Sequence, residues 1–103
     1  MPRAALGQHF LIDRRVLTEI LTAANLSHSD IVLEIGPGKG FLTKELLRRV
    51  KKVVAIELDE TLAGSLNHRL GYPSNLTILN ADARYVNLGS IIGTDLPYKV
   101  VAN

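Results

Sequence analysis

Three glycines alternate with other residues in Gly36-Pro37-Gly38-Lys39-Gly40, between an apolar run and a helical pattern. Glycine adopts positive φ angles at no steric cost and lets the backbone approach a ligand closely. A second apolar run ends in an acid, Glu57, about twenty residues beyond the glycines. A strand, a glycine turn, a helix and a second strand ending in a carboxylate form the arrangement that binds the ribose of an adenosine-containing cofactor. The G-x-G-x-G spacing favours S-adenosylmethionine over a dinucleotide, for which G-x-G-x-x-G is typical.

Glu57 is the candidate ribose ligand. Its carboxylate can accept hydrogen bonds from both ribose hydroxyls, each worth roughly 1.5–3 kcal/mol because the acceptor is charged. The same charge would repel a 2′-phosphate, which disfavours a phosphorylated dinucleotide. The alternative is that Glu57 is a solvated acid at the end of a strand.

Two further polar residues follow predicted strands. Asp82 lies in Asn80-Ala81-Asp82-Ala83, at the sheet edge where ligands of such folds bind. Its carboxylate could accept a hydrogen bond from the exocyclic amine of adenine, while the Ala83 N–H donates to a ring nitrogen. Alternatively, Asp82 caps the segment that follows it. Asn103 would bring to that edge an amide oxygen able to accept hydrogen bonds from an amine undergoing alkylation, although the local sequence alone assigns it no role.

Alternating helices and strands must position these groups. Four helices are expected. The first begins after Asp13 and has an apolar stripe that includes Val16, and the second follows Gly40 and extends as far as Val50. The third runs from about Asp59 to a left-handed stop at Gly71, and the fourth lies around Ile91. The expected strands are residues 31–35, 53–56, 76–79 and 98–102. This alternation predicts an α/β fold, and right-handed crossovers give a parallel sheet of order 3-2-1-4.

Length and composition narrow the class of protein. The 103 residues, 47% of them apolar, suit one small domain. No cysteine is present, and His9, His28 and His68 lack metal-ligand spacing, so we expect no metal site. No stretch resembles a signal peptide or reaches the length of a membrane span. We therefore expect a cytoplasmic protein that does not bind membranes.

Basic residues cluster although the net charge is only +2. Two interpretations stay open: a solvated helix face whose cations are favoured near the helix C-terminus, or a nucleic-acid contact. The cluster comprises Lys44, Arg48, Arg49, Lys51 and Lys52.

The last predicted strand ends almost where the sequence ends. Val100 and Val101 would then lie on a sheet edge with one side uncovered, which complete proteins avoid because such edges pair with other chains. We expect this chain to be the first part of a longer protein, and its exposed edge strand to favour self-association.

Four segments, in order along the chain, resemble the N-terminal part of a ribosomal RNA adenine N6-dimethyltransferase. They are Gly7-Gln8-His9-Phe10-Leu11, Glu34-Ile35-Gly36-Pro37-Gly38-Lys39-Gly40 with Phe41-Leu42-Thr43, Ile56-Glu57-Leu58-Asp59, and Asn80-Ala81-Asp82-Ala83. The resemblance implies a Rossmann-like methyltransferase fold with S-adenosyl-L-methionine as cofactor, acting on N6 of adenosines in structured RNA. It also implies that His9 and Leu11 contact the cofactor, Gly36 its methionine half, Glu57 its ribose and Asp82 its adenine. The family often has asparagine at the position of His9.

The catalytic motif of that family is Asn-Leu-Pro-Tyr after the fourth strand, and only its asparagine, Asn103, is present here. The resemblance implies that Asn103 is catalytic and also contacts the cofactor. Residues 1–103 would form the N-terminal part of the methyltransferase domain, truncated after the fourth strand and without the helical C-terminal domain. We expect this part to bind cofactor without turnover, as a non-catalytic module.

The relatives implied by the resemblance fall into two groups. One dimethylates two adjacent adenosines near the 3′ end of small-subunit ribosomal RNA, in immature small ribosomal subunits. The other modifies a large-subunit adenosine and confers antibiotic resistance. Pro37 and Phe41-Leu42-Thr43 resemble the first group more closely, and the second remains the alternative.

Overall fold

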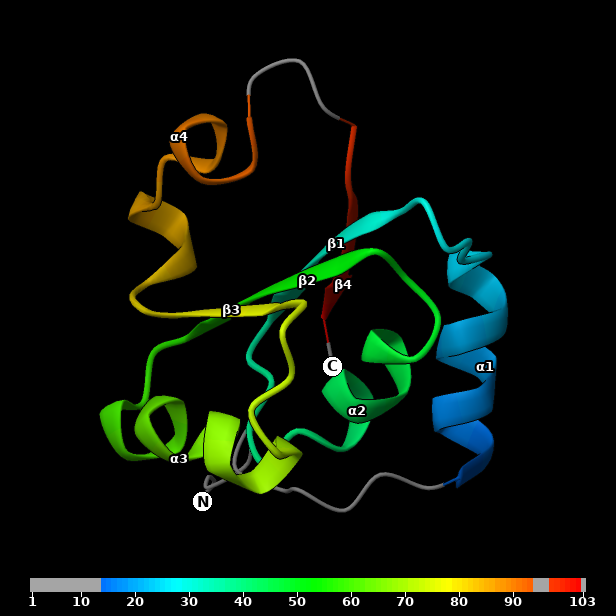
Figure 1. Cartoon of the computed structure of the whole chain (residues 1–103), viewed down its shortest axis with the longest axis horizontal. Coiled ribbons are helices and arrows are strands. Elements are labelled where there is room, and N and C mark those ends of the chain that lie inside the picture. Colours follow the sequence, from blue (N-terminus) through cyan, green and yellow to red (C-terminus); the bar gives the residue numbers. More distant parts are fainter. Residues whose placement is uncertain (1–13, 94–96, 103) are drawn as a thin grey trace.

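The computed structural model describes residues 14–93 and 97–102, which alternate between helices and strands (Figure 1). This alternation is the one predicted, and each strand end differs from the prediction by one residue at most. The Asp13 cap lies outside the described residues. The elements are α1 (Arg14–Ala24), β1 (Ile31–Ile35), α2 (Phe41–Leu47), β2 (Lys52–Glu57), α3 (Glu60–Leu70), β3 (Leu76–Asn80), a 3₁₀ helix (Ala83–Tyr85), α4 (Leu88–Ile92) and β4 (Lys99–Ala102).

All four strands are parallel and lie in the order β3-β2-β1-β4, which confirms the predicted 3-2-1-4 topology. In the register, Ile35 is level with Ile56 and with Ala102, and Glu57 is level with Asn80. The carboxyl ends of the strands therefore form one edge, from which the loops after β1, β2 and β3 start. We call this the carboxyl edge, and the opposite one, where the strands begin, the amino edge.

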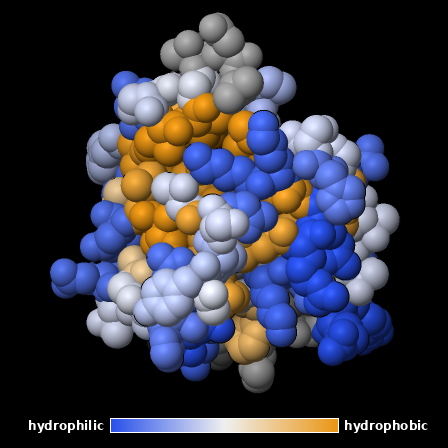
Figure 2. Space-filling view, in the orientation of Figure 1, coloured by the Kyte–Doolittle hydropathy of each residue, from blue (hydrophilic) through white to orange (hydrophobic). Residues whose placement is uncertain are grey.

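Two apolar layers cover the sheet. β1 and β2 are buried on both faces, as expected of strands that read as continuous apolar runs. The layer beneath α1 and α2 is built from Val32, Leu42, Leu46, Val50, Val53 and Val101. The layer beneath α4 is built from Leu33, Val54, Ile56 and Ile92. In the view of Figure 2, hydrophilic residues cover the side where α1 lies, whereas apolar surface is visible beside α4.

Helix α1 packs on its layer through the predicted stripe, except at Val16. Leu17, Ile20, Leu21 and Ala24 contact the buried residues, but Val16 is 43% exposed. At 100° per residue, Val16 lies about 90° from the centre of the stripe formed by the other four side chains. Its expected place in the core was therefore wrong.

Helix α2 is shorter than predicted, whereas α3 has the predicted ends. α2 ends at Leu47, and Val50 is buried in the turn that follows, where the N–H groups of Arg49 and Val50 both donate to the Leu46 carbonyl. Such shared carbonyls are common where a last helical turn tightens. α3 begins at the predicted cap, Asp59, and ends at the predicted left-handed Gly71.

Strand β4 occupies a sheet edge, as predicted. Val101 is buried in the layer beneath α1 and α2, whereas Val100, on the other face, is 56% exposed. Only one face of this strand is therefore uncovered. Among the described residues, no helix has the length and hydropathy that crossing a membrane would require.

Candidate cofactor-binding site

The loop after β1 forms the floor of the candidate site. Gly36, Gly38 and Gly40 have φ angles of 70°, 60° and 90°, in the left-handed region that favours glycine. The Gly36 N–H donates to the Ile56 carbonyl at 2.9 Å, which ties the loop to the end of β2. A Cβ added at Gly36 would meet no atom within 4 Å, so space is open above this residue. This is where the sequence predicted that a ligand approaches the backbone.

Gly40 serves a different purpose from Gly36. A Cβ added at Gly40 would lie 2.8 Å from Cδ1 of Leu66, on α3. The third glycine therefore lets the start of α2 pack against α3, whereas the first lies under open space.

Glu57 lies beside the glycine loop, and it is not the solvated acid that was the alternative. The residue is 7% exposed. Its Oε1 accepts a hydrogen bond from the Gly38 N–H at 3.0 Å, and its Oε2 accepts one from the Asp59 N–H at 2.9 Å. Because an ionised carboxylate has about four lone-pair sites, Glu57 can hold the loop and still accept hydrogen bonds from a ligand.

The loop after β3 reaches the same edge. The Ala81 N–H donates to the Glu57 carbonyl at 3.1 Å, and the Asn80 side chain donates to the carbonyls of Glu57 and Leu58 at 3.0 and 3.1 Å. Asn80 thus joins the loops after β2 and β3. Its place in the motif gave no hint of this role, because the role depends on the register between the two strands.

Asp82 caps the 3₁₀ helix that follows it, as one of its two interpretations predicted. Its Oδ1 accepts a hydrogen bond from the Arg84 N–H at 3.0 Å, and the Arg84 guanidinium pairs with both carboxylate oxygens, at 2.7 Å for Nη2–Oδ2. Hydrogen bonds from Arg84 lower the pKa of Asp82 to about 2. The role of Asp82 in binding adenine stays a prediction, in which the adenine amine would share this carboxylate with Arg84.

Glu34 is a buried acid to which the sequence assigned no separate role. It is 1% exposed, on the face of β1 that α2 covers. The Thr43 hydroxyl donates to its Oε1, whereas its Oε2 is buried and has no hydrogen-bond partner. Burial raises the pKa of Glu34 to about 7, against the lowering effect of the Thr43 hydrogen bond, and the charge of Glu57 adds to the rise. The available signal was an acid within an apolar strand.

The structure therefore brings Gly36, Glu57 and the Asp82 loop together at the carboxyl edge. His9, Leu11 and Asn103 lie outside the described residues, and their roles stay predictions. The described part of the chain holds no group of His, Cys, Asp and Glu side chains able to bind a metal ion. In the segments that follow β1, β2 and β3, the acids Glu57, Asp59 and Asp82 outnumber the bases Lys39 and Arg84, which suits a ligand that carries positive charge.

The chain matches one protein family over nearly its whole length. The family model for ribosomal RNA adenine dimethylases matches residues 2–103. Ribosomal RNA small subunit methyltransferase A of Dehalococcoides mccartyi is 48% identical over 102 residues, which are 98% of this chain and 35% of that protein. The protein of the same name from Clostridium acetobutylicum is 44% identical over 95% of this chain and 36% of its own length. The chain thus spans about a third of these curated relatives.

Solved structures show the same fold. The 23S rRNA methyltransferase ErmE superposes with a TM-score of 0.78 at 35% identity, over 91% of this chain and 36% of that one. A dimethyladenosine transferase from Plasmodium falciparum superposes with a TM-score of 0.76 at 34% identity, over 92% of this chain and 33% of that one. The predicted Rossmann-like methyltransferase fold is confirmed.

Proposed function

The chain belongs to the ribosomal RNA adenine dimethylase family, and from that membership we propose that the whole protein methylates N6 of adenosines in small-subunit ribosomal RNA. The methyl donor in this proposal is S-adenosyl-L-methionine. The names of the curated relatives support the small subunit as the source of the RNA. Residues 1–103 would supply the first part of the methyltransferase domain and with it most of the cofactor site.

The finer assignment extends this proposal. We propose that the targets are two adjacent adenosines near the 3′ end of the RNA. The substrate would be this RNA within immature small ribosomal subunits, and the reaction would take place in the cytoplasm. Pro37 and the Phe41-Leu42-Thr43 continuation support this assignment over the large-subunit alternative.

The residues of the carboxyl edge fit the proposed cofactor. The open space above Gly36 suits the methionine half, and Glu57, fixed by two backbone N–H groups, keeps lone pairs for ribose hydroxyls. When bound, the cofactor supplies a methyl group made labile by its positively charged sulfur. The carboxylate of Glu57 would favour that positive charge electrostatically.

Asn103 would act on the base to be methylated. A base inside a duplex must leave its stack to reach the methyl group. The amide oxygen of Asn103 would accept a hydrogen bond from the N6 amine and hold its nitrogen in line with the methyl group. The amine is a weak nucleophile because its lone pair is delocalised into the ring, so this positioning contributes directly to the rate.

The contact between the Glu57 carboxylate and the Gly38 N–H is the observation that best supports the proposal, because it holds the predicted ribose ligand against the loop that carries the predicted ligand Gly36. The test is transfer of a radiolabelled methyl group by the whole protein to small subunits purified from cells that lack the modification. We expect labelling of adenosine N6, abolished by Asn103→Ala and retained by Arg69→Gln, a surface change on α3. Unchanged labelling by the Asn103 variant would overturn the role of that residue.

The large-subunit activity is a second candidate, because ErmE, a 23S rRNA methyltransferase, is similar in structure. The same assay with large-subunit RNA separates the two. Labelling of large-subunit RNA alone would reject the small-subunit assignment. The expectation that residues 1–103 bind cofactor without turnover is tested by calorimetric titration with S-adenosylhomocysteine beside the methyl-transfer assay.

A further inference from the structure

A surface pocket lies where α1 and α2 end, near the amino edge of the sheet and away from the candidate cofactor site. Its volume is about 650 Å³, within the range of ligand pockets. Polar side chains from both helices and from the loop after α1 contribute to its lining. They include Thr22, Asn25, His28, Arg48 and Arg49.

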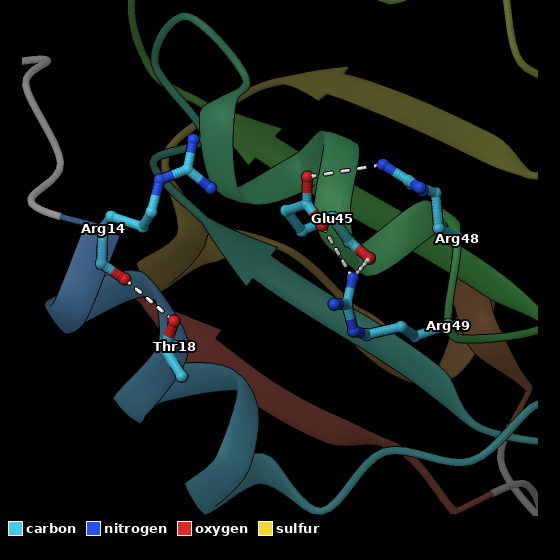
Figure 3. Close-up of polar contacts among 5 residues, drawn as sticks. All are labelled: Arg14, Thr18, Glu45, Arg48 and Arg49. Carbon is cyan, nitrogen blue, oxygen red and sulfur yellow. Dashed lines mark hydrogen bonds and ion pairs between the residues drawn. The ribbon is translucent and has the colours of Figure 1, made fainter.

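The two arginines of this pocket share one carboxylate. Arg49 Nη1 lies 2.8 Å from Glu45 Oε1 and also donates to the Glu45 carbonyl at 2.9 Å, whereas Arg48 Nη1 lies 3.7 Å from Glu45 Oε2 (Figure 3). Hydrogen bonding to Arg49 lowers the pKa of Glu45, so this acid is ionised at neutral pH. One negative charge therefore faces two positive charges. Because Arg48 is held by one long contact and its side chain is 67% exposed, most of its five N–H donors can serve a ligand.

Other cations at the amino edge add to this excess. Lys51 and Lys52 lie at the start of β2, where their N–H groups donate to the Asp30 carbonyl. Lys99, at the start of β4, pairs with the Asp30 carboxylate at 2.9 Å. Two arginines and three lysines thus lie in this region of the chain, together with two carboxylates, those of Asp30 and Glu45.

The carboxyl edge has no such excess of positive charge. The acids Glu57, Asp59, Glu60 and Asp82 and the buried Glu34 lie there with four bases, Lys39, Arg84 and, at the start of α1, Arg14 and Arg15. Between these two edges, polyanion binding is therefore electrostatically favoured at the amino edge.

We propose that the pocket formed by Arg48, Arg49, His28 and Asn25 binds a backbone phosphate of the substrate RNA, remote from the base that is methylated. This inference rests on the proposed function. The planar guanidinium forks of the arginines match the geometry of phosphate oxygens. The ends of β1, Ile31 and Ile35, are four steps apart, so the two edges are separated by roughly 13 Å at about 3.3 Å per residue. A phosphate contact at that distance fixes the orientation of an RNA without reading its sequence.

The test measures binding of the whole protein to small-subunit ribosomal RNA transcribed in vitro, over a series of salt concentrations. The variants are Arg48→Gln, the double change Arg48→Gln with Arg49→Gln, and Arg69→Gln as the matched control on α3. Removing one side chain that binds a phosphate lowers the slope of log K against log salt by about 1. We expect a slope lower by about 1 for Arg48→Gln, RNA binding weaker by roughly tenfold for the double variant, and wild-type values for Arg69→Gln.

A second measurement separates RNA binding from folding and from the proposed function. S-adenosylhomocysteine should bind all the variants equally well, because the pocket lies away from the cofactor site. If the double variant does not fold, the single Arg48→Gln variant decides, because its side chain is largely exposed. If Arg48→Gln has the RNA affinity and the salt slope of the wild type, the pocket does not bind an RNA phosphate. That result would leave the proposed function intact. A wild-type protein that neither binds nor methylates this RNA would overturn both.

Discussion

Replacing Glu34 by glutamine should change how the stability of the protein depends on pH. The carboxyl of Glu34 is buried, its Oε1 accepts a hydrogen bond from Thr43, and its Oε2 has no partner. Glutamine has nearly the same shape, can keep the bond from Thr43 through its amide oxygen, and does not ionise. The comparison therefore isolates ionisation at this position.

The size of the effect follows from the two pKa values of Glu34. Its pKa rises from 4.5 to about 7 in the folded state, which corresponds to about 3 kcal/mol at roughly 1.4 kcal/mol per pH unit. Between these values the folded protein binds more protons at Glu34 than the unfolded chain does. The stabilising contribution of Glu34 is therefore full below about pH 4.5 and is lost as the pH rises through 7.

The assay is urea denaturation at pH values from 4.5 to 8, with the free energy of unfolding measured for the wild type and for Glu34→Gln. Relative to the wild type, the variant should gain stability as the pH rises, by about 3 kcal/mol over the whole range. Glu45→Gln is the matched control and should show no such gain, because hydrogen bonding to Arg49 lowers the pKa of Glu45. Parallel pH profiles for the wild type and Glu34→Gln would refute the reasoning, since Glu34 would then ionise in the folded protein as easily as in the unfolded chain.

Three other changes test the carboxyl edge and its support. Glu57→Ala removes two hydrogen bonds of roughly 1.5–3 kcal/mol each to the cofactor ribose and should weaken S-adenosylhomocysteine binding by a hundredfold or more, measured by calorimetry; wild-type affinity would reject the ribose role. Arg84→Ala should raise the pKa of Asp82 from about 2 toward its usual value, so the carboxyl resonance of Asp82 in an NMR titration should move at higher pH; an unmoved titration would show that the pair does not form in solution. In thermal denaturation, Gly40→Ala should destabilise the protein more than Gly71→Ala, because both positions have positive φ but only the Cβ at position 40 would lie within 3 Å of a side chain; equal losses would contradict the packing at that position.

The sheet could be predicted from the sequence because its determinants are local and strong. Apolar runs bounded by turn residues marked each strand, and the right-handed crossover rule then gave the order 3-2-1-4. The alternating glycines before α2 marked the loop in the same way. Two predictions about helices were wrong, namely that Val16 lies in the core and that Val50 lies within α2. A helical pattern of apolar residues defines the ends of a helix and the limits of its buried face less sharply than an apolar run defines a strand.

The surroundings of the acids could not be predicted, because they depend on contacts between distant residues. Nothing local shows that Gly38 and Asp59 both donate to Glu57, or that Thr43 faces Glu34 across the interface between β1 and α2. Asp82 is the exception, since its partner Arg84 is two residues away and the capping role needed only local sequence.

The strand order also sets a sequence of events during synthesis. β1 is hydrogen-bonded to β2, which follows it closely, and to β4, whose Lys99 is level with Val32 although 67 residues later in the chain. At about 5–20 residues per second, the ribosome needs roughly 3–13 s to add that stretch. For those seconds one side of the central strand has no partner while its apolar side chains are already made. A nascent chain stalled in this interval exposes the sheet's most hydrophobic strand, so a slow codon between residues 60 and 95 should promote aggregation more than one placed after β4.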